Sequence, residues 1–243
     1  MMTSIKTIKP LPTLRDLTPL ISSSMSPDLL ALSATLYHRS ASVRAVKNRM
    51  DDQNRFTVTF HALDQLAREN DLPIAIVGGL GAIHFGYPAT TEDIDVAIAS
   101  DQLQTLLDVA PQFGFRIAWR AETGLHTLTL SDVEINVVPE GRRARNDSPT
   151  TIPSPKQLGV SQGLDYANIE GWMELKISSG RRKDLTHVIE VLKKCDGIAV
   201  EKVRQHLAAI HPSYLSTFNQ LANEAIQESQ QEDQRSRSRG TKI

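Results

Sequence analysis

The stretch 74–99 constrains the fold more than any other part of the sequence. It opens with four apolar, mostly β-branched residues, which are typical of a short buried strand. Gly78 and Gly79 follow, and they allow a sharp turn and a close approach of the backbone to a ligand. A short helix is predicted from about Leu80 to Phe85, ending before Pro88, because proline disfavours helical geometry at the preceding residue.

Two acids begin the next predicted strand, Ile94–Ile98, in the sequence Asp93-Ile94-Asp95. Side chains alternate along a strand, so Asp93 and Asp95 point to one face. Adjacent carboxylates repel each other, and a cation between them relieves that repulsion. Oxygen ligands at this spacing suit Mg²⁺ or Mn²⁺. Together with helix amides that attract phosphate, the pattern favours metal-assisted phosphoryl or nucleotidyl transfer.

The glycine pair followed by Thr91-Glu92-Asp93-Ile94-Asp95 resembles the signature of the nucleotidyltransferase superfamily. The chain is similar to minimal and abortive-infection-type members, whose acid strand commonly follows an arginine and a threonine. Thr91 matches the threonine, whereas Ala89 stands at the usual arginine. The resemblance implies an α/β fold: a small mixed β-sheet with flanking helices, completed by a helical C-terminal part. The alternative is an ordinary βα turn with a solvated acidic strand.

A third candidate strand, Val133–Val138, places Glu134 and Asn136 on one face. The resemblance implies a third acid here that helps to hold metal or deprotonates the attacking hydroxyl. The local pattern puts Asn136 at that position, and Glu134 faces the same way and reaches further. An amide coordinates metal weakly and cannot act as a base at neutral pH.

A second motif lies in the segment 166–192, which is predicted to be helical in two pieces separated by Gly180. It resembles the abortive-infection-type pattern of a lysine, an arginine, and a basic residue with an aspartate opening a helix. The resemblance implies that Lys176 and Arg181 contact the nucleotide phosphates, and that Asp184 fixes them or assists the base. The alternative is a capping aspartate beside surface cations.

Composition restricts the other possibilities. The 243 residues carry a net charge of −1, so any surface that binds nucleic acid has to be local. Cys195 is the single cysteine, which excludes an internal disulfide, and the chain lacks the motifs of zinc sites. The sequence shows neither a signal-peptide core near Met1 nor an apolar run that spans a membrane, which predicts a cytoplasmic protein that does not bind membranes.

Along the chain, helices are predicted at Ser26–His38, Asn54–Glu69 and Asp101–Val109, and strands at Phe115–Trp119 and Leu125–Leu130. The polar loop 141–154 contains three arginines, which either meet triphosphate or RNA phosphates or are simply solvated. The predicted organisation is a flexible N-terminal arm (1–24), a nucleotidyltransferase-like core (25–160), a helical C-terminal part (161–226) and a disordered tail (227–243).

These motifs predict the metal-dependent transfer of a nucleoside monophosphate from an NTP to a hydroxyl acceptor. RNA, a protein side chain and a small molecule all remain open as acceptors. The resemblance also implies a role in a toxin–antitoxin pair, with a cognate antitoxin or another protein as partner. The alternative function is a catalytically impaired protein of the same fold that acts as a nucleotide-binding or partner-binding module.

Overall fold

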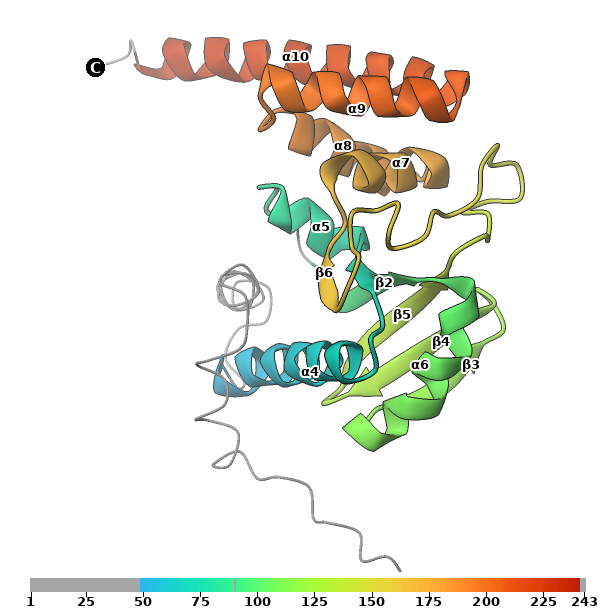
Figure 1. Cartoon of the computed structure of the whole chain (residues 1–243). Coiled ribbons are helices and arrows are strands. Elements are labelled where there is room, and N and C mark those ends of the chain that lie inside the picture. Colours follow the sequence, from blue (N-terminus) through green and yellow to red (C-terminus); the bar gives the residue numbers. More distant parts are fainter. Residues whose placement is uncertain (1–48, 90, 241–243) are drawn as a thin grey trace, which may run out of the picture.

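The computed structural model describes residues 49–89 and 91–240, and it shows an α/β fold (Figure 1). One mixed six-stranded sheet has the strand order β3-β4-β5-β2-β1-β6. The strands are β1 (Ile74–Ile76), β2 (Asp93–Ile98), β3 (Arg116–Arg120), β4 (Leu125–Leu130), β5 (Val133–Pro139) and β6 (Leu164–Tyr166). The predicted class of a small mixed sheet with helices is confirmed. The predicted arm 1–24 and helix Ser26–His38 lie outside the described residues.

Helices cover both faces of the sheet (Figure 1). They are α4 (Arg49–Glu69), α5 (Gly78–His84), α6 (Leu103–Val109), α7 (Ile169–Ser179), α8 (Arg182–Leu192), α9 (Gly197–Ile210) and α10 (Pro212–Gly240), with short 3₁₀ segments η1 (Ser100–Gln102) and η2 (Ala110–Phe113). Helices α4 and α6 pack on one face, and α7–α10 form the helical C-terminal part on the other side. Within 49–89 and 91–240, none of the helices combines the length and the apolar character needed to span a membrane.

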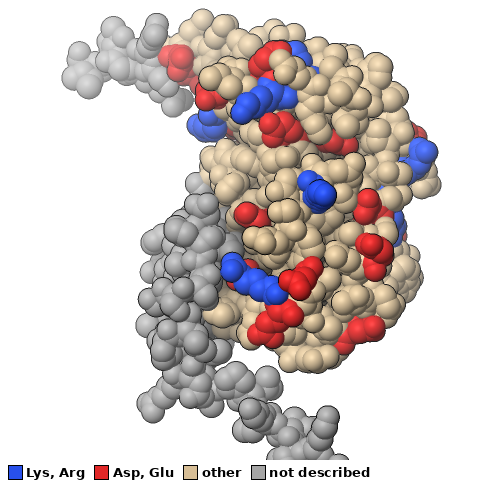
Figure 2. Space-filling view, viewed as in Figure 1, with Lys and Arg blue, Asp and Glu red and all other residues tan. Residues whose placement is uncertain are grey.

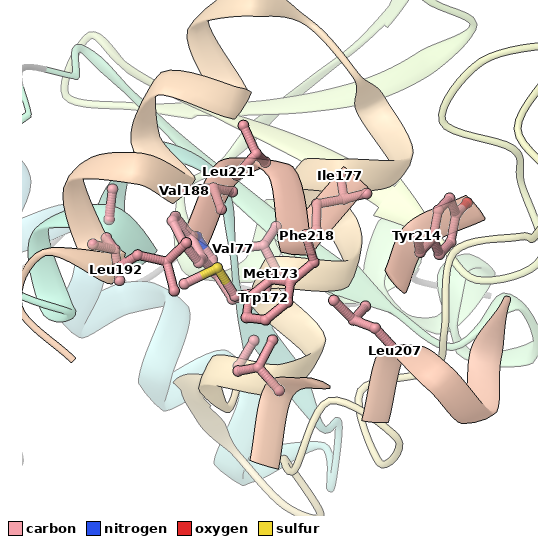
Figure 3. Packing of buried hydrophobic residues seen from close by; sticks show 14 of the residues in the cluster. Val77, Trp172, Met173, Ile177, Val188, Leu192, Leu207, Tyr214, Phe218 and Leu221 are labelled. Carbon is pink, nitrogen blue, oxygen red and sulfur yellow. The ribbon is translucent and has the colours of Figure 1, made fainter. Parts of the chain in front are cut away.

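The alternation of side chains along β2 decides which residues enter which core. Ile94, Val96 and Ile98 belong to the apolar cluster shared with α4 and α6. Ala97 points the other way and belongs to the cluster of the C-terminal helices, part of which Figure 3 shows. Because side chains alternate, Asp93 and Asp95 share the face of Ala97. The two carboxylates therefore lie on the face of the sheet that the C-terminal helices cover.

The strand β6 was not predicted, because the sequence assigns a helical start to Tyr166. Leu164–Tyr166 instead pairs in parallel with β1, with Leu164 opposite Ile74. A three-residue strand is too short to show its own periodicity. Helix α7 begins only after Asn168, whose side chain caps it by accepting a hydrogen bond from the Gly171 amide at 2.8 Å.

Helix α5 begins at Gly78 and not at about Leu80, so the predicted glycine turn at Gly78 and Gly79 is the first turn of this helix. The starts of two other predicted helices differ as well. Helix α4 begins at Arg49, before the expected Asn54 cap, and ends at Glu69 as predicted. Asp101 lies inside η1 rather than capping α6, which starts at Leu103 and ends at the predicted Val109. Each start lies in a polar segment with several candidate caps, so the sequence leaves the choice open.

Residues 227–240, predicted to be disordered, continue α10. Lys193, the residue after α8, supplies a reason, because its ammonium pairs with Glu228 at 2.6 Å and with Glu232 at 3.0 Å. Its side chain is only 7% exposed, and it also pairs with Glu190. A buried cation requires such partners, so the acids of the tail are held in helical register against α8.

Candidate active site

The centre of the candidate site is the start of β2 beside β5. The parallel register sets Asp93 opposite Glu134 and Asp95 opposite Asn136. Asp93 and Asp95 are both half-buried. Burial raises the pKa of Asp95, and the neighbouring Asp93 charge raises it further. The two carboxylates therefore form a crowded negative centre that favours a proton or a cation.

Asn136 lies between these carboxylates. Its Nδ2 donates to Asp95 Oδ1 at 3.0 Å and to Asp93 Oδ2 at 3.2 Å. Ionised carboxylates only accept hydrogen bonds, so the NH₂ end of the amide has to face them. Glu134 points at a different partner, because its carboxylate pairs with Arg120 of β3. The structure thus places Asn136, rather than Glu134, against both acids.

The glycine turn lies directly against this pair. Gly78 has φ +66°, and a Cβ there would lie 1.9 Å from Asp95 Oδ2, so no other residue fits without displacing the carboxylate. A Cβ at Gly79 would lie 3.1 Å from Thr91. The Thr91 hydroxyl in turn donates to Asp93 Oδ1 at 2.8 Å. Of the predicted nucleotide-binding residues, Gly78 and Thr91 thus contact the acids directly, and Gly79 packs against Thr91.

The second motif forms an ionic cluster at the junction of α7 and α8, in which Lys176 and Asp184 are buried and Arg181 is exposed. Lys176 Nζ lies 2.5 Å from Asp184 Oδ1, and Arg181 Nε donates to Asp184 Oδ2 at 2.7 Å. The Ser179 hydroxyl donates to the same Oδ2 at 2.5 Å. Burial by itself raises the pKa of Asp184, but Lys176, Ser179 and Arg181 together outweigh it and lower that pKa. Asp184 is therefore an ionised anchor for both cations.

One pocket of about 410 Å³ joins the two motifs. Gly78, Asp95 and Asn136 line it from the sheet, and Lys176, Arg181 and Asp184 line it from α7 and α8. Asp93 and Glu134 are not among its lining residues. The volume falls in the range of small-molecule and cofactor pockets.

The arginines of the loop 141–154 also line this pocket. Arg142 donates to the carbonyl oxygens of Thr123 and Gly124 in the β3–β4 turn. Arg143 donates to the carbonyl oxygen of Ser148, and Arg145 pairs with Asp147 at 3.2 Å. The partners of Arg142 and Arg143 are neutral, so their positive charges remain available to an anion in the pocket.

The donor set fits a hard divalent cation. Asp93 and Asp95 present oxygen ligands side by side, and the absence of a side chain at Gly78 lets the Asp95 carboxylate pack against the backbone there. No cluster of three or more His, Cys, Asp or Glu suited to a metal occurs among the described residues. Two carboxylates with phosphate and water completing the shell is the coordination typical of Mg²⁺.

Comparisons with known proteins are distant. No protein-family model matches the chain, and no curated protein sequence matches it. The solution structure of the antibiotic-resistance factor ANT(2'')-Ia is similar at TM-score 0.37 and 13% identity, covering 76% of this chain and 100% of that chain. An apo CCA-adding enzyme is similar at TM-score 0.33 and 16% identity, covering 69% of this chain and 50% of that chain. A Thermotoga maritima CCA-adding enzyme in complex with tRNA is similar at TM-score 0.32 and 16% identity, covering 83% of this chain and 54% of that chain.

These likenesses are too distant to assign a family or an activity to the chain, so the predicted family remains a prediction. The chain spans about half the length of the CCA-adding enzymes.

Two pocket residues have no counterpart in the sequence predictions. Ser179 shares Asp184 with the cations, and Trp172 donates to the carbonyl oxygen of Gly78. Trp172 lies four residues before Lys176 on one helix, so the spacing alone places both on the same face. That spacing was the available signal.

Proposed function

We propose that this protein is a metal-dependent nucleotidyltransferase that moves a nucleoside monophosphate from an NTP to a hydroxyl acceptor. One observation carries the proposal: the carboxylate of Asp95 and the cation cluster of Lys176 and Arg181 line the same pocket. A metal–triphosphate complex needs both kinds of group at once, oxygen ligands for the metal and cations for the phosphates.

Each group has a role in this proposal. Asp93 and Asp95 hold Mg²⁺ or Mn²⁺, which when bound neutralises phosphate charge and orients the reacting phosphate. In this proposal the backbone N–H groups around Gly78 and Gly79, at the start of α5, cradle the phosphates. An acceptor oxygen attacks the α-phosphorus, a new P–O bond forms, and the bond to the bridging oxygen of the β-phosphate breaks. The pyrophosphate then carries the released charge.

The cations offset that charge. Five cations line the pocket: Lys176, Arg181, Arg142, Arg143 and Arg145. Among the residues that the structure describes, the acids that line it are Asp95 and Asp184. Fixed cations near a leaving pyrophosphate stabilise the transition state without reorganisation. The chain as a whole has a net charge of −1, so this positive excess is local to the pocket.

Glu134 and Asp184 are the proposed bases for the acceptor proton. Both are ion-paired in the structure, Glu134 with Arg120 and Asp184 with Lys176 and Arg181. Either must give up a cation contact before it takes a proton, which favours slow turnover unless the substrate rearranges these pairs.

The same observation, with Asn136 at the position of a third acid, favours a second candidate function. In this alternative the chain binds nucleotide without transferring it and acts as a nucleotide-binding or partner-binding module. Such a module would bind NTP, but it would gain less from Mg²⁺.

RNA, protein and small molecules remain the candidate acceptors, and membership of a toxin–antitoxin pair in the cytoplasm remains part of the proposal. Figure 2 shows acidic and basic residues interspersed over the viewed face, which argues against broad, non-specific contact with RNA there.

The test is label transfer from α-³²P-labelled NTPs to total RNA and total protein, with Mg²⁺ or with EDTA. The wild type should transfer label only with Mg²⁺, and Asp93→Asn and Asp95→Asn should each lose at least about 100-fold, as expected when a metal ligand is removed. The matched control is Asp108→Asn, an exposed acid on α6. Transfer that persists in both site variants would exclude the carboxylate mechanism. Metal-independent binding without transfer would favour the second candidate.

A further inference from the structure

Trp172 is a buried aromatic residue that neither motif includes. It lies on α7, is fully buried, and lines the pocket with Asp95 and Lys176. Figure 3 shows it within the cluster of buried side chains that also contains Val77, the residue before the glycine turn. A buried indole N–H needs an acceptor, and the choice of acceptor is informative here.

That acceptor is the glycine turn. Trp172 Nε1 donates to the carbonyl oxygen of Gly78 at 3.0 Å, across 94 positions of sequence. Gly78 packs so closely on Asp95 that a Cβ there would lie 1.9 Å from Asp95 Oδ2. The indole N–H therefore fixes the orientation of the peptide group that borders the carboxylate pair.

Helix α5 is shaped to receive the indole. A Cβ at Gly81 would lie 2.3 Å from both Cδ1 and Nε1 of Trp172. Real Cβ atoms do not approach other atoms so closely, so a side chain at this position displaces the ring and breaks its hydrogen bond. The ring of Phe85, just after α5, lies 5.5 Å from the ring of Trp172 and closes another side.

The face of the same indole meets the cation cluster. Lys176 Nζ lies 5.7 Å from the ring centroid of Trp172, within the range of a cation–π contact. Lys176 also holds Asp184, which in turn holds Arg181. One side chain thus contacts both halves of the pocket, the glycine turn through its N–H and the cations through its ring face.

We propose that Trp172 is a positioning residue that sets the glycine turn and the cation cluster at the separation a metal-bound triphosphate requires. The inference rests on the proposed function, because it needs the pocket to take a nucleotide. Loss of the N–H leaves both halves present but no longer held in one geometry. Affinity for Mg–NTP then falls while the fold remains.

The first measurement uses the fluorescence of Trp172 itself. The chain has two tryptophans, and Trp119 is 59% exposed on β3, so Trp119→Phe leaves Trp172 as the only tryptophan. This variant is titrated separately with Mg²⁺ complexes of ATP, GTP, CTP and UTP. The emission of Trp172 should change and saturate with the midpoint that calorimetry gives for the same nucleotide.

The second measurement removes the hydrogen bond. Trp172→Phe should weaken Mg–NTP binding roughly five- to tenfold, the loss expected for one hydrogen bond. Gly81→Ala should weaken it similarly by displacing the ring, and Trp119→Phe is the matched control with unchanged affinity. Combined with Lys176→Gln, Trp172→Phe should cost less than the sum of the two single losses, because both act on one geometry. Urea unfolding of the same variants shows whether the coupling lies in nucleotide affinity, as a positioning role requires, or only in the stability that two contacting side chains share.

The outcomes separate the two proposals. If the wild type binds Mg–NTP but folded Trp172→Phe binds it equally well, or if Trp172 emission does not respond at saturation, the inference is wrong and the proposed function stands. If the wild type binds none of the four nucleotides, both are wrong. Should Trp172→Phe not fold, the emission of Trp172 in the Trp119→Phe protein decides: a change that saturates with nucleotide supports the inference, and no change contradicts it.

Discussion

A single amide sets the electrostatics of the carboxylate pair. Asn136 donates to both Asp93 and Asp95, so it offsets part of their repulsion by hydrogen bonding without adding charge. An acid at this position would instead add a third negative group and another metal ligand. The choice at residue 136 therefore exchanges metal affinity for stability of the metal-free protein.

Asn136→Asp tests that exchange. We expect about tenfold tighter Mn²⁺ binding, since affinity at such sites follows the number of charged ligands, and a lower melting temperature in EDTA because of repulsion. Calorimetry and thermal unfolding of the same preparations measure the two effects. The isosteric control is Asn219→Asp on α10, where Asn219 contacts Arg204. Unchanged metal affinity in the site variant would show that position 136 does not face the ion.

At the scale of elements, the junction of α7 and α8 combines charge with burial. Helix α8 begins at Arg182, the residue after Arg181. His187 lies on this helix one turn after Asp184, the partner of Arg181. The His187 side chain is buried beside Tyr87, with ring centroids 5.5 Å apart. Burial, and then the charge of Lys176, lowers the pKa of His187 to about 4.

This shift predicts a pH dependence of stability. Between pH 6.5 and about pH 4 the unfolded chain binds a proton at His187 that the native state does not, so the free energy of unfolding falls as the pH falls through this window. In the His187→Gln variant the free energy of unfolding should depend less steeply on pH, because unfolding then takes up one proton fewer in this window. Urea unfolding at half-unit pH steps measures it, with His211→Gln as control, because His211 lies between α9 and α10 and contacts the Ser213 hydroxyl. Equal slopes in wild type and His187→Gln would contradict the shift.

At the scale of the molecule, the sheet and the C-terminal helices are two layers that meet at the pocket (Figure 1). The loop 141–154 bridges them, because Thr150 contacts the hydroxyl of Tyr214 on α10 at 2.9 Å and the Ser148 hydroxyl donates to the carbonyl oxygen of Ser178 on α7 at 3.0 Å. These contacts hold the loop that carries the pocket arginines against α7 and α10. The end of α10 is held separately by Lys193.

Deleting residues 227–243 tests the contribution of that end. Lys193 would keep only Glu190, so we expect a loss of about 1 kcal/mol in the free energy of unfolding, a modest value because Glu228 and Glu232 are partly exposed. The loss should shrink in 0.5 M salt, as screened surface pairs do. Glu228→Gln with Glu232→Gln should reproduce it in the full chain. A truncated protein as stable as the wild type at low salt would show that this end is dispensable.

Local physics was enough for the parts of the site that lie close together in sequence. The glycine turn, the strand that bears Asp93 and Asp95, and the helix that follows Gly180 all follow from glycine geometry and apolar periodicity within a few residues. The α/β class follows from the same signals. The polar composition of the tail lacks an apolar stripe and so predicts no helix there, whereas the structure continues α10 to Gly240 and pairs Glu228 with Lys193, the residue after α8.

Only the tertiary structure decided what faces what across the sheet. The parallel pairing of β2 with β5 set Asn136, and not Glu134, against both acids. Trp172 reaches Gly78 for the same reason, since contacts across many residues are fixed by packing rather than by local propensity. Side-chain chemistry along the chain thus determined which groups are present, and the pairing of distant segments determined which of them meet.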